Sequence, residues 1–313
     1  MGRLTDQEKK RIDVMFELGY SSRKISKELW GTKTRKSTVN DYLASKMAAV
    51  SYHPKVLLID IETSPEVSMH WRRFKENITE DQNLQYTKVL GFCYKWLGEA
   101  DVYSVYPEAP PVFMEDSSDE YGIIEQAHAL FTEADIIVGH NVDRFDVPVL
   151  NARMIYHGFN KPRPFKTIDT LKIAKTEFRF PQNRLDVICN YLGLGRKVEH
   201  EGFQLWRKCM MGDPDAWAKM EEYNIGDVVL LEELYLKLRS WTPRVPNMSL
   251  TYPNSIARCP TCGSHDIEVS EGFAFTQVSV FDLYHCNDCG GWARGRKNVK
   301  TTEQRENVLT TVR

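Results

Sequence analysis

Val56-Leu-Leu-Ile-Asp-Ile-Glu-Thr63 is an apolar run interrupted by two carboxylates. A short run rich in branched apolar residues is typical of a buried strand. Because side chains alternate along a strand, Asp60 and Glu62 share one face while Ile59 and Ile61 face the opposite core. The sequence therefore predicts a buried strand that displays two acids side by side.

Two further motifs carry acids, Asn141-Val-Asp-Arg-Phe-Asp146 and Tyr223-Asn-Ile-Gly-Asp227. Residues four apart share one face of a helix, so Tyr223 and Asp227 are expected to lie together. Asp146 lies near a predicted helix start, just beyond the carboxyl end of a predicted strand, where open sheets place their sites. Four converging carboxylates repel one another unless a divalent cation shares the site. The pattern indicates a nuclease that uses metal ions.

The surrounding region, residues 54–243, is predicted to be an α/β domain. Strands are expected at 56–63, 87–96, 101–106 and 135–140, and helices at about 121–133, from Phe145, after Asp169, within 183–197 and at about 214–238. Strands in succession, followed by alternating helix and strand, imply a mixed sheet flanked by helices. This order fits a ribonuclease H-like core.

The three acidic motifs resemble, in order and approximate spacing, the exonuclease motifs of the DEDD superfamily of 3′-to-5′ exonucleases. Tyr223 places the resemblance with the tyrosine subclass found in proofreading domains of family B DNA polymerases. The stretch from Leu57 through Lys95-Trp-Leu-Gly-Glu99 is similar to predicted exonucleases of bacteriophage and bacterial genomes. The resemblance covers the region 54–243 and implies hydrolysis of DNA from a 3′ end.

Two Mg²⁺ or Mn²⁺ ions are expected, because phosphodiester hydrolysis builds negative charge on both the entering and the leaving oxygen. The resemblance implies that Asp60 bridges the ions, that Glu62 and Asp227 complete one site, and that Asp146 acts on the second through water. A phenol with a pKa of about 10 is a poor base. Tyr223 is therefore expected to orient the attacking water.

Three neighbours of the acids are candidates for holding substrate: Thr63, Asn141 and Phe145. Asn141 has the alternative of capping the following turn, and Phe145 that of packing in the core. His140 is expected to be structural, and Asp169 to cap the next helix. Weaker candidates for contacts with the nucleic-acid backbone, with a plain solvated surface as the alternative, are Asn183, Arg184, Arg196 and Lys197. The insertion Pro65–Asn83 is a candidate for guiding a single strand, since aromatic residues stack on bases while Arg and Lys follow phosphates, and an ordinary surface loop is the alternative. It contains Trp71, Arg72, Arg73 and Lys75.

Residues 1–48 predict three short helices, capped by Thr5, by Ser21 or Ser22, and by Ser37. The pattern resembles the helix-turn-helix domains of site-specific recombinases and transposases, which implies a third helix in the DNA major groove. The connection Trp30–Lys36 is longer than the usual turn, and a bundle that docks on protein is the alternative. Basic residues suited to phosphates cluster around the second helix: Arg23, Lys24, Lys27, Lys33, Arg35 and Lys36.

The region 255–298 contains Cys259-Pro-Thr-Cys262 and Cys286-Asn-Asp-Cys289, separated by 23 residues. Two such pairs can supply four thiolates to one structural Zn²⁺, and the strand-rich segment between them resembles a zinc ribbon. Its partner is either nucleic acid, through Trp292, Arg294, Arg296 and Lys297, or protein. Residues 299–313 are expected to form a disordered polar tail.

Charge and hydropathy narrow the class of protein. Residues 1–50 hold eleven Lys and Arg against six Asp and Glu, whereas the chain as a whole has a net charge of −2. A basic N-terminal segment suits contact with a polyanion. No apolar run approaches the roughly 20 residues of a membrane span, so a cytoplasmic protein of a bacterium or a phage-infected cell, without membrane contact, is expected.

Three other functions compete with a DNA exonuclease. A resolvase-like or transposase-like DNA endonuclease also combines a helix-turn-helix with an acidic core and a zinc module. An RNA exonuclease would need a pocket for the 2′-hydroxyl, which a sequence does not reveal. A non-catalytic DNA-binding regulator is disfavoured by the unbroken set of four acids.

Overall fold

The structure is a computed structural model that describes residues 4–48, 53–72, 74, 77–107, 120–252 and 256–312, without the side chains of residue 17 and residues 44–48. Its contacts divide the chain into two units. Pro54–Pro246 and Cys289–Trp292 form one, here called the central unit. The other comprises Met1–His53, Asn247–Asp288 and Ala293–Arg313. Part of the predicted boundary near residue 50, together with Arg73 and Lys75, lies outside the described residues.

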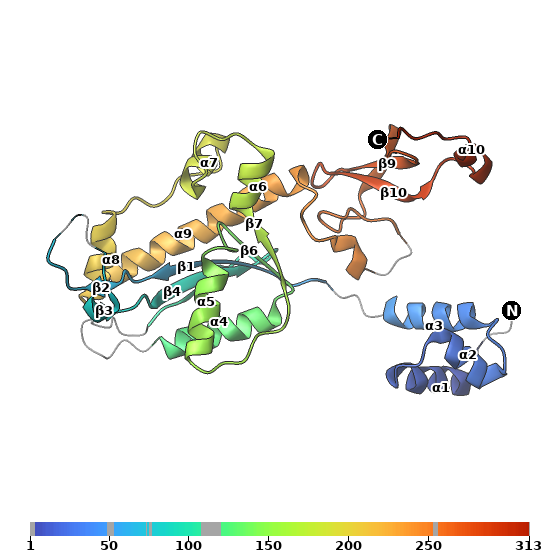
Figure 1. The fold of residues 1–313 in the computed structure, drawn as a ribbon, viewed down its shortest axis with the longest axis horizontal. Coiled ribbons are helices and arrows are strands. Elements are labelled where there is room, and N and C mark those ends of the chain that lie inside the picture. Colours follow the sequence, from blue (N-terminus) through green and yellow to red (C-terminus); the bar gives the residue numbers. More distant parts are fainter. Residues whose placement is uncertain are drawn as a thin grey trace. The chain divides into compact units, whose positions relative to one another are not determined.

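The central unit is built on a five-stranded mixed sheet (Figure 1). Its strands are β1 (Val56–Thr63), β4 (Val89–Trp96), β5 (Tyr103–Val105), β6 (Ile136–Gly139) and β7 (Lys166–Asp169), in the spatial order β5-β4-β1-β6-β7. β4 pairs antiparallel with β1 and β5, while β6 pairs parallel with β1 and β7. The predicted mixed sheet flanked by helices is confirmed, with β1 at its centre.

Six helices of the central unit are described: α4 (Tyr121–Glu133), α5 (Asp146–Tyr156), α6 (Thr170–Glu177), α7 (Leu185–Leu192), α8 (Phe203–Met210) and α9 (Pro214–Leu238). Short elements complete it: β2 (Val67–Ser68), η1 (Glu80–Gln82), β3 (Asn83–Gln85) and η2 (Arg239–Trp241). The helices predicted at 121–133 and 214–238 match α4 and α9. The sequence did not predict β7 or α8.

The two faces of the sheet bury different helices. Leu57, Ile59 and Ile61 of β1 pack in one cluster with residues of α4 and α5. Leu90 of β4 packs on the other side with residues of α8 and α9. Fully burying a Leu or Ile contributes roughly 1.5–3 kcal/mol, so this alternation fixes which face of β1 meets which helix. Asp60 and Glu62 therefore lie on the face covered by α9.

The start of the long helix α9 is determined by its N-cap and by a proline. Asp213 caps it by accepting hydrogen bonds from the backbone N–H groups of Asp215 (3.0 Å) and Ala216 (3.3 Å). Pro214 occupies the first helical position, where its missing N–H costs nothing and its fixed φ suits a helix. The helix then runs without a break through the acidic motif at Asp227.

The N-terminal segment forms three helices, α1 (Asp6–Glu17), α2 (Ser22–Trp30) and α3 (Lys36–Ala48). Thr5 caps α1 in a capping box with Glu8, and Ser21 caps α2, as predicted. The predicted cap at Ser37 is wrong, because α3 begins one residue earlier and Ser37 lies in its first turn. The core of the three helices consists of Ile12, Ile25, Val39 and Leu43.

The C-terminal segment contains η3 (Met248–Thr251), β8 (Ile267–Phe275), β9 (Val280–Cys286), β10 (Trp292–Asn298) and α10 (Thr302–Glu306). The three strands form a sheet in the order β10-β9-β8. α10 contradicts the expectation of disorder after residue 298, since Thr301 and Gln304 form a capping box that starts this short helix. None of the described helices is both long and apolar enough to cross a membrane.

Candidate active site

β1 and α9 are joined at their polar residues. Asn224, which is fully buried, donates hydrogen bonds from Nδ2 to Oδ2 of Asp60 (2.7 Å) and to its carbonyl oxygen (3.2 Å). Asn224 lies three residues before Asp227, so both side chains leave the same face of α9. The helix thus presents Tyr223, Asn224 and Asp227 to the acids of β1.

Asp146 comes to the same place from α5. It is the first residue of that helix and is 2% exposed, and its Oδ1 accepts a hydrogen bond from the backbone N–H of Ile61 (3.2 Å). Ile61 lies between Asp60 and Glu62. The negative charges of Asp146, Asp227 and Glu62 all act on Asp60. The structure therefore brings the four predicted acids together from three elements.

These acids hold protons more tightly than ordinary carboxyl groups. Burial, followed by repulsion from Asp227, raises the pKa of Glu62 to about 8. Burial raises the pKa of Asp146 to about 7, although the N–H of Ile61 opposes the shift. The pKa of Asp60 is also raised, by burial and then by the charge of Asp146. At neutral pH the group cannot become fully ionised unless a cation enters.

Lys197 adds a cation to this group of acids, a contact that the sequence does not predict. Its ammonium donates a hydrogen bond to the Tyr223 hydroxyl (3.0 Å) and forms an ion pair with Oδ2 of Asp227. Burial favours the neutral amine, but the charge of Asp227 and the contacts with Tyr223 outweigh it and raise the pKa of Lys197. The sequence predicts only backbone contacts for Lys197, because a loop residue distant in sequence carries no pattern that points to the site.

The residues present fit a divalent metal ion. Oδ1 of Asp227 is buried and has no hydrogen-bond partner in the described part of the chain, which leaves a carboxylate oxygen available as a ligand. Carboxylate oxygens are the ligands that Mg²⁺ and Mn²⁺ prefer. Among the described residues no group containing these acids is gathered as tightly as the cysteines discussed below. Lys197 supplies the positive charge next to Asp227 in this structure.

Tyr223 is poorly suited to act as a base. Burial, followed by the charge of Asp227, raises the pKa of its phenol above the ordinary value, and Lys197 only partly opposes this shift. The phenol is consequently protonated at neutral pH. Its ring is fixed by edge-to-face contact with His200, at 4.6 Å between centroids. This arrangement suits a hydroxyl that orients a neighbouring molecule.

The three predicted substrate contacts differ in their surroundings. Thr63 ends β1 and is half-buried, beside an irregularity in the β1–β4 register. Asn141 has φ of 80°, and its carbonyl accepts hydrogen bonds from the N–H groups of Arg144 and Phe145, so it shapes the turn before α5. Phe145 is 39% exposed and is therefore accessible to a ligand.

His140 and Asp169 have structural contacts, as expected. The two ring nitrogens of His140 lie 2.9 Å from Oγ1 of Thr170 and 2.8 Å from the carbonyl oxygen of Asn183. Asp169 caps α6 by accepting from the N–H of Leu171, and it also accepts from the N–H of Asn141 (3.0 Å). The second contact was not predicted, and it ties β7 to the turn that leads to Asp146.

The cysteines form a second candidate metal centre. The Sγ atoms of Cys259, Cys262, Cys286 and Cys289 all lie within 4.8 Å of one another. Four thiolates at such distances can surround one tetrahedral ion. The cluster is consistent with the predicted zinc ribbon.

We expect the metal-free protein to lose stability as the pH rises from about 5 to 8. The pKa of Glu62 is near 4.5 in the unfolded chain and about 8 in the folded one. Between these values the folded state holds more protons, so the free energy of unfolding falls as pH rises. Thermal unfolding without metal should show this fall, and Glu62→Gln should flatten it. A midpoint in the wild type no more dependent on pH than in the variant would contradict the assignment.

The chain is similar to a known protein family and to solved structures. The sequence profile of the RNase H superfamily matches residues 78–239, which include Asp146, Tyr223 and Asp227. Among solved structures, the family B DNA polymerase from the hyperthermophilic archaeon Pyrobaculum calidifontis is similar, with 17% identity and a TM-score of 0.43. The similarity covers 64% of this chain and 27% of the polymerase, so this chain spans about a quarter of that protein's length. No curated protein matches the chain.

Proposed function

The chain belongs to the RNase H superfamily, and on that premise we propose that it is a metal-dependent 3′-to-5′ exonuclease that hydrolyses phosphodiester bonds of DNA. The observation that carries the proposal is the meeting of Asp60, Glu62, Asp146 and Asp227 at one place, with pKa values raised by burial. Such a group of acids has little structural value, because burying it costs stability. It is suited to holding divalent cations against a phosphate.

The four acids would hold two Mg²⁺ or Mn²⁺ ions, which when bound acidify the attacking water and stabilise negative charge on the phosphate. Asn224 fixes the carboxylate of Asp60, and the N–H of Ile61 fixes that of Asp146. The Tyr223 hydroxyl orients the water. Lys197 keeps that hydroxyl in place and adds positive charge where the phosphate must lie.

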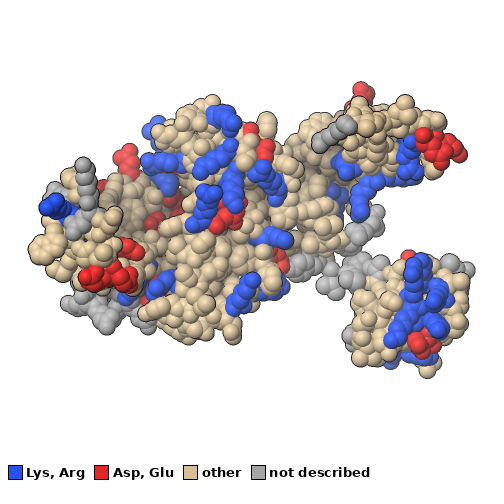
Figure 2. Space-filling view, viewed as in Figure 1, with Lys and Arg blue, Asp and Glu red and all other residues tan. Residues whose placement is uncertain are grey.

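The N-terminal helices would bring DNA to the site. Lys36, Ser37 and Asn40 are exposed on α3, while Val39 and Leu43 are buried in the core of the three helices. An exposed helix face with amide, hydroxyl and ammonium groups suits contacts with base edges and phosphates in the major groove. Lys24 and Lys27 of α2 are exposed as well, and Figure 2 shows Lys and Arg forming a band across this domain.

The four cysteines would hold one structural Zn²⁺. A closed shell of four thiolates leaves no position for a reacting water, so this ion would stabilise the small sheet β8–β10 and take no part in hydrolysis. Among the described residues of the C-terminal segment few apolar side chains are buried, so such an ion would contribute much to its stability.

Digestion of end-labelled nucleic acids tests the proposal. Single-stranded DNA carrying a 5′ label should yield a ladder that shortens from the 3′ end, whereas a 3′ label should be released at once as a mononucleotide. Both reactions should require Mg²⁺ or Mn²⁺ and stop with EDTA. Parallel digestion of duplex DNA and RNA measures the preference for substrate. Internal cutting alone, or equal activity in EDTA, would rule out the proposed reaction.

A further inference from the structure

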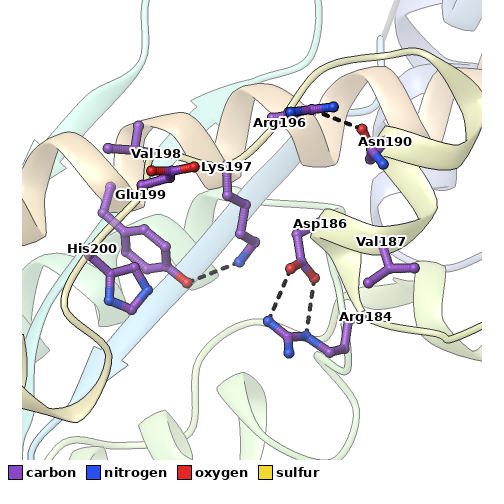
Figure 3. Close-up of a pocket in the computed structure, with 10 residues that line it drawn as sticks. Arg184, Asp186, Val187, Asn190, Arg196, Lys197, Val198, Glu199 and His200 are labelled. Atoms are coloured by element: carbon purple, nitrogen blue, oxygen red, sulfur yellow. Dashed lines mark hydrogen bonds and ion pairs between the residues drawn. The ribbon is translucent and has the colours of Figure 1, made fainter.

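A cavity of about 490 Å³ opens beside Tyr223 and Lys197 (Figure 3). Its walls come from α7, from the residue before that helix and from the segment 196–200. Lys197 lines the cavity and also contacts Asp227. The cavity is therefore continuous with the candidate active site.

Two arginines are held along one wall of this cavity. Nε and Nη2 of Arg184 donate to the two carboxylate oxygens of Asp186, at 3.1 and 3.0 Å. Nε of Arg196 donates to Oδ1 of Asn190, at 3.1 Å. Asp186 and Asn190 are four residues apart on α7 and so share one face of the helix. The two residues that hold the arginines are about one helical turn apart, a rise of roughly 6 Å along the axis of α7.

Both guanidinium groups keep donors for a ligand. Nη1 of Arg184 and both terminal nitrogens of Arg196 have no hydrogen-bond partner among the described residues. The side chain of Arg184 is 72% exposed, and Arg196 is exposed too. Guanidinium groups match the oxygens of a phosphate in charge and geometry. Figure 2 shows that Lys and Arg gather over α6 and α7 on the face in view.

The reaction determines where phosphates of the substrate lie. In an enzyme that removes the 3′-terminal nucleotide, the scissile phosphate must reach the four acids. Every other phosphate of the strand lies on its 5′ side. Two cationic groups held from one face of α7, in the cavity that Lys197 also lines, suit phosphates of such a strand.

We propose that this cavity is a subsite for the strand on the 5′ side of the scissile bond, in which Arg184 and Arg196 each bind one backbone phosphate. The proposal rests on the proposed function. Asp186 competes with the phosphate for Arg184, so contact with the strand exchanges one acceptor for another. Such an exchange favours release of the strand and its advance by one nucleotide after each hydrolysis.

Substrates with and without these phosphates test the subsite. Thymidine 5′-monophosphate p-nitrophenyl ester contains the scissile phosphate alone, whereas a single-stranded decanucleotide contains the upstream ones. The ratio of kcat/KM for the decanucleotide to that for the ester should fall about 10-fold in Arg184→Ala and in Arg196→Ala, as expected for one lost charge-assisted hydrogen bond. Arg179→Ala is the matched control, because within the described part of the chain this exposed arginine donates only to backbone carbonyls.

Binding provides an independent measurement that does not require turnover. The affinity of wild type for an uncleaved, fluorescently labelled decanucleotide in Ca²⁺ should fall with salt, and each variant should reduce the slope of log affinity against log salt by about 0.7. Ratios and slopes equal to those of Arg179→Ala would overturn the subsite. Wild type that binds with the expected slope but hydrolyses neither substrate would retain the subsite and refute the proposed function.

Discussion

Asp60→Asn is expected to reduce hydrolysis of single-stranded DNA about 1,000-fold or more, equivalent to about 4 kcal/mol of transition-state stabilisation. Asparagine keeps the size of the side chain and can still accept from Asn224, so the packing of β1 against α9 should persist. What is lost is the anionic ligand placed centrally among three other acids. Single-turnover rates at saturating Mg²⁺ measure the loss.

Asp143→Asn is the matched control for this substitution. Asp143 lies three residues before Asp146 and pairs with Lys172 (2.6 Å) at the surface. Its replacement should leave the rate within a factor of about two, since exposed ion pairs contribute little. The thermal midpoint of Asp60→Asn should equal or exceed that of wild type, and that of Asp143→Asn should lie close to it. An Asp60→Asn enzyme that retained a tenth of the wild-type rate would remove Asp60 from the reaction.

Lys197→Met is expected to destabilise the metal-free protein by about 3 kcal/mol, because it leaves the buried carboxylate of Asp227 without its partner. Saturating Mg²⁺ should restore most of the lost stability, since the ion then supplies the missing positive charge. The rate with DNA should remain about 100-fold below that of wild type even when metal is saturating, as for other lost groups that stabilise a developing charge.

Lys197→Arg keeps the positive charge of the side chain and changes its shape, so it separates the effects of the two. It keeps the cation next to Asp227 and Tyr223, so the metal-free protein should unfold near the wild-type midpoint. Thermal unfolding of the three proteins with and without Mg²⁺ provides the measurement. If Mg²⁺ stabilised wild type and Lys197→Met equally, the ammonium and the metal would not act on the same carboxylate.

The parts of the fold that the sequence predicted are those in which local pattern and tertiary packing agree. β1 is an apolar run that is buried along almost its whole length, and α9 carries a proline at its start and a helical apolar period over 25 residues. β7 has four residues and a single apolar side chain in the core, so its pairing with β6 provides the only evidence of a strand. α8 has only eight residues, and because isolated helices of that length are marginal in water, its burial against α9 decides its structure.

The residues of the candidate site also divide into those that a local sequence pattern reveals and those that only the folded chain brings together. Spacing along a strand predicts that Asp60 and Glu62 share one face, and spacing along a helix predicts the same for Tyr223 and Asp227. The position of Asp146 just beyond the end of a strand places it near them. Asn224 could have been found by the same reasoning, since it precedes Asp227 by three residues on a helix. Lys197 could not, because it lies on a connection between helices and meets Asp227 only when the chain folds.

Because α9 is uninterrupted, its structure predicts how the protein loses activity on heating. Tyr223, Asn224 and Asp227 precede the fully or almost fully buried Leu230, Leu231 and Leu234 on one rigid helix. These reacting groups have no hinge or loop of their own that could open while the core remains packed. Loss of activity at high temperature should therefore accompany cooperative melting of the central sheet, without an earlier stage in which a folded but inactive protein accumulates.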